Sequence, residues 1–70
     1  MTTGKRIRQL RLDRNLSQKK LAWKLGIHRH TIGGWENDRW LPPWASLGQL
    51  ADFFHVSIQY LLNGDDKGGG

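Results

Sequence analysis

The residues best suited to chemistry lie in the second half of the run SQKKLAWKLGIHRHTIGGWE. We assume that Ile32 faces the core and place the other residues around a helical wheel at about 100° per residue. The residues that fall opposite Ile32 form the outward side of the helix. That side carries Arg29 at its edge, His30, Gly33 and Gly34. Arginine can donate two hydrogen bonds to guanine O6 and N7, and histidine can bond a purine N7 or a phosphate. Because bare glycines allow close approach of a backbone, the run predicts a surface that reads base pairs in a DNA groove.

Two short helices joined by a tight turn are needed to hold that surface. The first is capped by Ser17, whose oxygen can accept a bond from a backbone N–H, and its apolar residues recur at helical spacing. Gly26 ends this helix, because glycine tolerates the left-handed conformation that closes a helix. A second helix follows at about 28–36. Residues 17–36 therefore predict a helix-turn-helix, the motif that lays its second helix in the DNA major groove.

The sequence offers no metal site and no catalytic centre. His28 and His30 are two residues apart and point about 200° apart on a helix, and no thiol or acid cluster joins them or His55. The serines stand at helix starts, the carboxylates are scattered, and no nucleophile, base and orienting group occur together. We therefore expect no metal, no cofactor, no small-molecule ligand and no enzymatic activity.

Charge is unevenly distributed along the chain. The net charge is +5, but the first 31 residues carry nine Lys or Arg against Asp13 alone, and the remainder is net negative. A basic face favours a polyanion because neutralised phosphates release condensed counterions; a charged solubilising surface is the alternative. With no cysteine and no apolar run long enough for a signal peptide or membrane span, we expect an intracellular, cytoplasmic protein.

Five short helices account for the apolar residues and predict an all-α fold without repeats. The helices are expected at about 4–14, 17–25, 28–36, 44–54 and 57–63. The chain then divides into a flexible lead at 1–3, a single domain at 4–63 and a disordered Gly-rich tail at 64–70. The predicted core comprises Ile7, Leu10, Leu16, Leu21, Ala22, Leu25, Ile27, Ile32, Trp35, Leu47, Leu50, Ala51, Phe54, Val56, Ile58 and Leu61.

Taken in order, these segments resemble the lambda-type phage repressor and Cro-like helix-turn-helix domains, also called XRE-type. The similar segments are RIRQLR, LSQKKLAWKLG, the corner Ile27, the pair Thr31-Ile32, the finish WEN, a proline before the next helix, and HVSIQYLL. The resemblance covers about 4–63. It implies a compact five-helix lambda-repressor-like fold that binds duplex DNA in transcriptional control.

The resemblance also implies roles for individual residues. The base edges would be faced by His28, Arg29, His30, Gly33 and Gly34. The DNA backbone would be met by Ser17, Gln18, Lys19, Asn37, Arg39 and Trp40, since helix starts and flexible cations hold phosphates without reading sequence. Arg11 and Glu36 would form a buried structural ion pair. Relatives often bind inverted repeats as dimers, so a weak homodimer on such a site is one expectation and a monomer is the alternative.

Three features depart from the family pattern. The Gly33-Gly34 pair replaces long polar residues, Asp38 stands where glycine is common, and tryptophans decorate the surface. Trp40 and Trp44 flank the two prolines and could pack on sugars, close a small satellite core or form a dimer patch. An alternative function is therefore a protein-interaction or antitoxin-like accessory module on the same scaffold. The features also suit an engineered or designed DNA binder.

Overall fold

The computed structural model describes residues 1–65 and places five α-helices there, with no strand among the described residues. The helices are α1 (Thr3–Asp13), α2 (Gln18–Leu25), α3 (Arg29–Glu36), α4 (Trp44–Phe54) and α5 (Ile58–Asn63). The all-α prediction is confirmed, and each boundary falls within two residues of the expected one. Most of the predicted tail, residues 66–70, lies outside the described residues.

Side-chain caps explain where four of the helices begin. The side chains of Thr2, Ser17, His28 and Ser57 each accept a backbone N–H bond from the first turn that follows. Such a cap satisfies one of the donors that a helix start leaves without a partner. Helix α4 starts instead after Pro43, which has no such bond but holds a backbone angle compatible with a helix start.

The start of the chain is more ordered than the sequence suggested. Helix α1 begins at Thr3, which is buried, and Thr2 caps the helix, so both residues belong to the domain although a loose lead was expected up to Thr3. The Thr2 hydroxyl also donates to Oδ2 of Asp38 at 2.6 Å. This contact joins residues 36 positions apart, which is why local sequence patterns did not indicate it.

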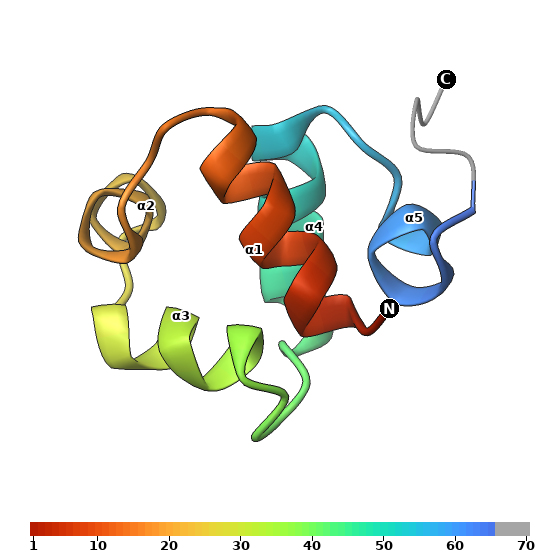
Figure 1. The fold of residues 1–70 in the computed structure, drawn as a ribbon, viewed down its shortest axis with the longest axis horizontal. Coiled ribbons are helices and arrows are strands. Elements are labelled where there is room, and N and C mark those ends of the chain that lie inside the picture. The colour runs from red at the N-terminus through yellow and green to blue at the C-terminus, as the bar shows by residue number, and fades with distance from the viewer. Residues whose placement is uncertain (66–70) are drawn as a thin grey trace.

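A single apolar core holds the helices together. Helix α1 packs against α3 and α5, α2 packs against α3, and α4 packs against α5. In Figure 1, α3 lies along the lower edge of the molecule and α5 lies on the right, with α1 between them. The buried apolar residues are Ile7, Leu10, Leu21, Ala22, Ile32, Trp35, Leu47, Leu50, Ala51, Phe54, Val56 and Leu61. All of them belong to the predicted core.

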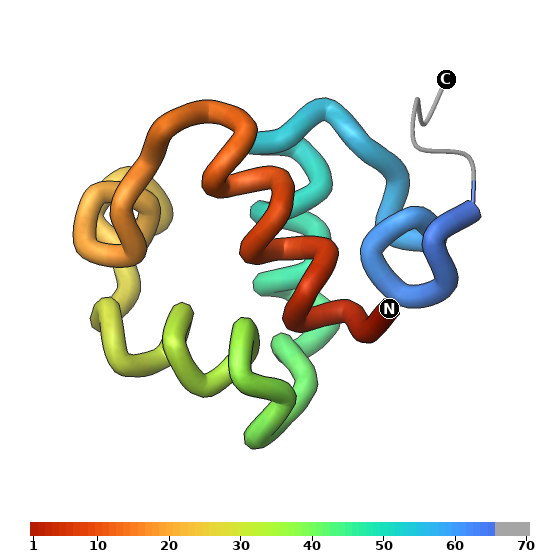
Figure 2. The backbone as a smooth tube through the Cα atoms, viewed as in Figure 1, coloured from red at the N-terminus to blue at the C-terminus, as the bar shows by residue number. Residues whose placement is uncertain are grey.

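Four predicted core residues are only partly buried, namely Leu16, Leu25, Ile27 and Ile58. Leu25, Ile27 and Ile58 pack on the edge of the core. Figure 2 shows that the chain passes from α2 to α3 through a short turn at the left edge of the molecule. Within residues 1–65, no helix is both long and apolar enough to cross a membrane.

Candidate nucleic-acid interface

Helices α2 and α3 form the helix-turn-helix that the sequence predicted. Gly26 follows α2 in the left-handed conformation, with φ of 70°, and its N–H donates to the carbonyl oxygen of Trp23 at 3.2 Å. The N–H of Ile27 donates to the carbonyl oxygen of Ala22 at 3.0 Å. These two bonds satisfy carbonyls at the end of α2 and reverse the chain. His28 then caps α3, with its Nδ1 accepting the N–H of His30 at 3.1 Å.

The exposed side of α3 borders a shallow depression of about 350 Å³. Its lining residues are Gln18, Arg29, His30, Gly33, Gly34, Asn37 and Arg39. Seven of the residues predicted from the sequence to meet DNA are therefore brought together from α2, α3 and the segment after α3. The lining contains two arginines and no acidic residue, so the depression is electrostatically suited to an anion.

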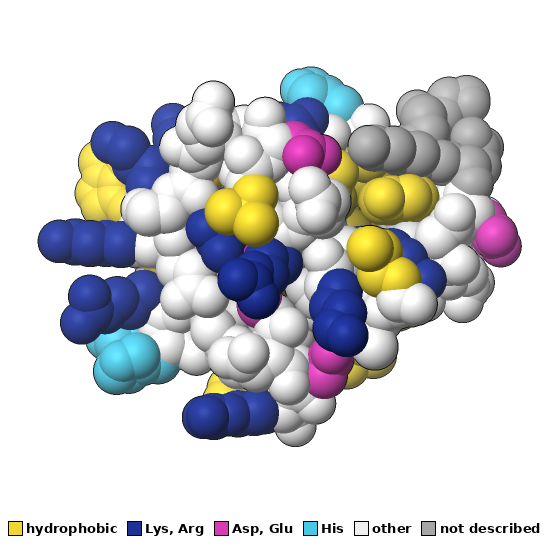
Figure 3. All heavy atoms as spheres, viewed as in Figure 1, with side chains coloured by type: hydrophobic (Ala, Val, Ile, Leu, Met, Phe, Trp, Pro, Cys, Tyr) yellow, Lys and Arg dark blue, Asp and Glu magenta, His cyan; other side chains and the backbone are white. Residues whose placement is uncertain are grey.

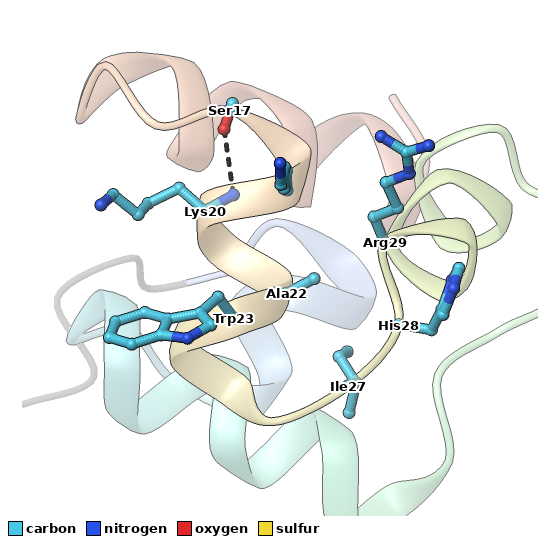
Figure 4. Close-up of a pocket in the computed structure, with 8 residues that line it drawn as sticks. Ser17, Lys20, Ala22, Trp23, Ile27, His28 and Arg29 are labelled. Atoms are coloured by element: carbon cyan, nitrogen blue, oxygen red, sulfur yellow. Dashed lines mark hydrogen bonds between the residues drawn. The ribbon is translucent and has the colours of Figure 1, made fainter.

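A second and larger cavity of about 800 Å³ is lined by residues of α2, the turn and the start of α3, among them Ser17, Lys19 and His28. Figure 4 shows Lys20 and Trp23 extending from one side of α2, and Arg29 and His28 beyond the other side of that helix. Its lining is also free of acidic residues. Ser17 has a structural task here, because its Oγ accepts the N–H of Lys20 at 2.9 Å.

A buried ion pair fixes the end of α3 to α1. Nε and Nη2 of Arg11 donate to the two carboxylate oxygens of Glu36 at 2.7 and 2.9 Å, and Nη1 donates to the carbonyl oxygen of Leu16 at 2.7 Å. The Arg11 and Glu36 side chains are 8% and 2% exposed. Bidentate geometry in a buried place makes such a pair strongly orienting. The pair is thus present where the resemblance implied it, between two helices that must keep a fixed angle.

Gln18 belongs to the same network. Its Nε2 donates to Oε1 of Glu36 at 3.0 Å, so the side chain lies across the start of α2 toward α3. A Cβ atom added to Gly33 would lie 3.7 Å from Oε1 of Gln18, which is ordinary van der Waals contact. Gln18 is therefore held against the end of α3 through Glu36, and it also lines the depression.

Gly34 does not present bare backbone to the outside, and here the sequence-based prediction must be corrected. The residue is buried, and the three heavy atoms nearest to an added Cβ all belong to the indole of Trp40. The glycine is needed because the ring occupies the space of its side chain. Helical periodicity alone gave Gly34 an outward direction, but it could not reveal that a residue of the following segment covers it.

The segment after α3 turns sharply at Asp38, whose φ is 58°. That left-handed conformation explains why glycine suits this position, as the family pattern suggests. The Asp38 carboxylate accepts the N–H of Gly4 at 3.2 Å and the Thr2 hydroxyl at 2.6 Å. A carboxylate at a helix start is favourable because it meets unpaired N–H groups and the positive end of the helix dipole. The acidic side chain is therefore committed to α1.

Asn37 and Arg39, which flank Asp38, are exposed and border the depression. The N–H of Asn37 donates to the carbonyl oxygen of Gly33, and that of Arg39 to the carbonyl oxygen of Gly34, both at 2.9 Å. These backbone bonds hold the segment against the end of α3 and leave the two side chains at the surface. Trp40, the remaining residue predicted to meet the DNA backbone, is 50% exposed.

Basic side chains gather on the part of the surface formed by α2 and the start of α3. In Figure 3 they project at the left and lower left of the molecule, where Figure 1 places these helices. Lys19, Lys20, Lys24 and Arg29 are all exposed there. Sequence reasoning assigned no DNA role to Lys20, although it borders the larger cavity beside Lys19. Its position in the first turn of a capped helix was the available signal.

The histidines do not form a metal site among the described residues, where no group of three or more potential ligands occurs. The rings of His28 and His30 lie 4.7 Å apart between centroids. Nδ1 of His28 is already used as the acceptor that caps α3. The close approach of the two rings therefore follows from the helix cap.

Comparison with known proteins agrees with this geometry. A family model described as a helix-turn-helix domain matches residues 4–67. The HTH-type transcriptional activator BcrR of Enterococcus faecalis is 36% identical over 94% of this chain and 32% of its own length. The HTH-type transcriptional regulator ImmR of Bacillus subtilis is 33% identical over 94% of this chain and 52% of its own length. The chain spans about a third to a half of the curated relatives it matches.

A solved structure is similar over nearly the whole domain. The P22 c2 repressor protein, crystallised in complex with synthetic operator 9T, superimposes with a TM-score of 0.87 at 31% sequence identity, covering 93% of this chain and 98% of the repressor chain. The immunity repressor protein of Bacillus phage phi105 is 31% identical over 89% of this chain and 43% of its own length. On the family match and the five-helix geometry together, the chain belongs to the helix-turn-helix domain family of the lambda-repressor-like type.

Proposed function

We propose that this domain binds duplex DNA in a sequence-specific manner, with α3 in the major groove, and that it serves transcriptional regulation without catalysis. The observation that carries the proposal is the surface around α3. Arg29 and His30 stand exposed at a depression that Arg39 also lines, and no acidic residue lines it. An α-helix fits the major groove, and such a surface matches base edges flanked by phosphates.

The relatives support the same function. Among them are proteins named as a transcriptional activator, transcriptional regulators and an immunity repressor, and the similar solved structure is a repressor in complex with an operator. Because this chain matches only part of each curated relative, the activator or repressor role of those proteins is not carried over. For this chain we propose only that it binds DNA and that it does so in the cytoplasm.

Within this function we assign base reading to Arg29 and His30. Arg29 can reach guanine O6 and N7 with two parallel donors, a contact worth about 1–3 kcal/mol of discrimination. Nδ1 of His28 stays engaged in the cap of α3, so His28 supports base reading by orienting this helix. Gly33 has no side chain, and only Gln18 lies within 4 Å of the position that a Cβ atom would take, so the helix can lie close to the groove floor.

Phosphate contacts are assigned to the residues around the depression and the larger cavity. Lys19 and Arg39 provide flexible cations, while the starts of α2 and α3 direct backbone N–H groups outward. Ser17, Gln18 and Asn37 stand at helix ends beside them. Such contacts fix the register of a protein on the duplex and leave base reading to α3.

The first test is selection of bound sites from a randomised duplex pool at near-physiological salt. We expect enrichment of a short motif, and an inverted repeat with half-sites about one helical turn apart if two copies bind together as a weak homodimer. Arg29→Ala should relax the preference at one base pair and lower affinity about 10- to 100-fold. Lys24→Ala, an exposed cation on α2 that borders neither cavity, is the matched control. Retention without enrichment would contradict sequence-specific reading.

A protein-interaction module is the second candidate, favoured by exposed tryptophans. Trp23 of α2 and Trp44 at the start of α4 are 75% and 70% exposed, and Leu41 in the loop before α4 is also exposed. Large apolar side chains at the surface are typical anchors of protein interfaces. Salt separates the two candidates, because binding of DNA weakens steeply with salt whereas a tryptophan-anchored interface does not.

A further inference from the structure

One position on the exposed side of α3 lacks a side chain and is nevertheless covered. Gly34 follows His30 by four residues, so the two positions lie one above the other on the same side of the helix. His30 is exposed, as that direction requires, whereas Gly34 is buried. Some other part of the chain must therefore cover this point of the surface that we propose faces DNA.

The cover is the indole ring of Trp40, which comes from the segment after α3. A Cβ atom placed on Gly34 would lie 2.6 Å from Cη2 and 2.8 Å from Cε2 of Trp40, and closer still to Cζ2. Separations this short leave no room for even a methyl group unless the ring moves. The ring thus rests directly on the helix backbone, and the N–H of Arg39 bonded to the Gly34 carbonyl fixes the segment that carries it.

The ring is not itself enclosed. Trp40 is 50% exposed, so about half of the residue still faces outward after the other part has covered Gly34. At this position the outer surface of the helix-turn-helix consequently consists of an indole. A long polar side chain extending from α3 is absent, and a flat aromatic side chain has taken its place.

From this arrangement we propose that Trp40 supplies, from the loop, the DNA-contacting side chain that Gly34 lacks, and that the contact is apolar. The inference rests on the proposed function of the same surface. An indole has one N–H donor and otherwise offers carbon, so it suits the apolar parts of a duplex. Those parts are the C5-methyl group of thymine in the major groove and the deoxyribose of the backbone.

The contact between Gly34 and Trp40 is tested first without DNA. The Tm of both single variants and of the double variant is measured by thermal unfolding and compared with that of the native chain. In the native background, Gly34→Ala should give no rise in Tm or lower it, because the new methyl group displaces the ring. In the Trp40→Ala background, the same Gly34→Ala change should raise Tm, because alanine favours helix over glycine and the ring is gone. An equal Tm shift in both backgrounds would overturn the pairing and the inference with it.

The DNA contact is then measured on the site recovered by selection. Trp40→Ala should lower affinity about tenfold, and Gly34→Ala should lower it similarly by displacing the ring. The slope of affinity against salt should stay unchanged in both variants, since an apolar contact releases no counterions. Trp44→Ala removes another exposed tryptophan from the same part of the chain and serves as the control, with an expected change below about twofold.

Uracil in place of individual thymines separates the two apolar partners. A loss of affinity for the native chain that Trp40→Ala abolishes would identify a thymine methyl group, while no loss at any thymine would identify deoxyribose. Native-level affinity of Trp40→Ala, or a reduced salt slope indicating a phosphate contact, would overturn the inference and leave the proposed function standing. If the native chain retained no duplex at all, the proposed function would fall as well.

Discussion

Arg6 and Arg11 of α1 have a different task from the basic residues of α2 and α3, although the two groups are close in sequence. In α1, Nη1 of Arg6 donates to the carbonyl oxygens of Leu61 and Leu62, both at 3.1 Å. Arg11 is buried against Glu36. The cations of α1 that bond in this way hold other helices in place.

Helices α2 and α3 show the opposite use of charge. Within residues 1–65, the side chains of Lys19 and Arg29 have no hydrogen-bond or ion-pair partner. Lys20 lies only over the Trp23 ring, with Nζ 5.7 Å from its centroid. Charges that are not tied into the fold remain available to a polyanion. The excess of basic residues in the first half of the chain thus combines a structural group and a binding group, which the charge count could not separate.

Replacement of Arg11 should have the largest effect, a loss of stability, because Arg11 belongs to the basic residues of α1 that hold other helices in place. Arg11→Met leaves Glu36 buried without its cation, and we expect the free energy of unfolding to fall by about 3–5 kcal/mol. Chemical denaturation measures this loss. The double variant Arg11→Met with Glu36→Met should recover much of it, because both charges are then removed together. A single-variant loss below about 1 kcal/mol would contradict the structural role.

A smaller structural effect is expected at Arg14. Its Nη2 donates to the carbonyl oxygen of Phe54 at 2.9 Å, and its guanidinium lies 5.0 Å from the centroid of the Phe54 ring. Because the residue is exposed, Arg14→Ala should lower stability by only about 1 kcal/mol. DNA affinity at a temperature where the variant is folded should not change. A clear loss of affinity would move Arg14 to the binding group.

The smallest effect is expected at Lys19 and should appear in binding alone. Lys19→Ala should reduce the slope of log affinity against log salt by about 0.9, which corresponds to one phosphate contact. The melting temperature should stay within the range of surface substitutions, because the side chain holds no other helix. Lys5→Ala removes an exposed cation of α1 and is the control, for which the salt slope should not change. An equal slope change in both variants would show that position on the surface does not matter.

The sequence predicted the fold well because its signals are local. Ser17, Gly26 and Ser57 mark helix ends through bonds that reach only a few residues, and the apolar spacing located every buried core residue. The same reasoning brought together the residues around the depression, since α2 and α3 are joined by a short turn. Bonds and spacings of this kind can be derived from the order of residues alone.

What the sequence did not predict depends on contacts between distant segments. Asp38 bonds to Thr2 and Gly4 across more than thirty positions, and no local pattern indicates such a partner. Trp40 covers Gly34 only because the chain turns back through the left-handed Asp38. Helical periodicity assumes that the outside of a helix is open, and this assumption fails wherever a following segment folds over it.

The bonds of Arg6 have a consequence for the connectivity of the chain. One guanidinium donates to the carbonyl oxygen of Met1 at 3.0 Å and to those of Leu61 and Leu62 at 3.1 Å, so Met1 and α5 lie within the reach of a single side chain. Figure 1 likewise shows the N-terminus beside α5. A short peptide linker could join these two regions, and new termini could open in the turn at His55, which is exposed. The domain is thus a natural candidate for circular permutation, in which α5 would precede α1 without altering the helix-turn-helix.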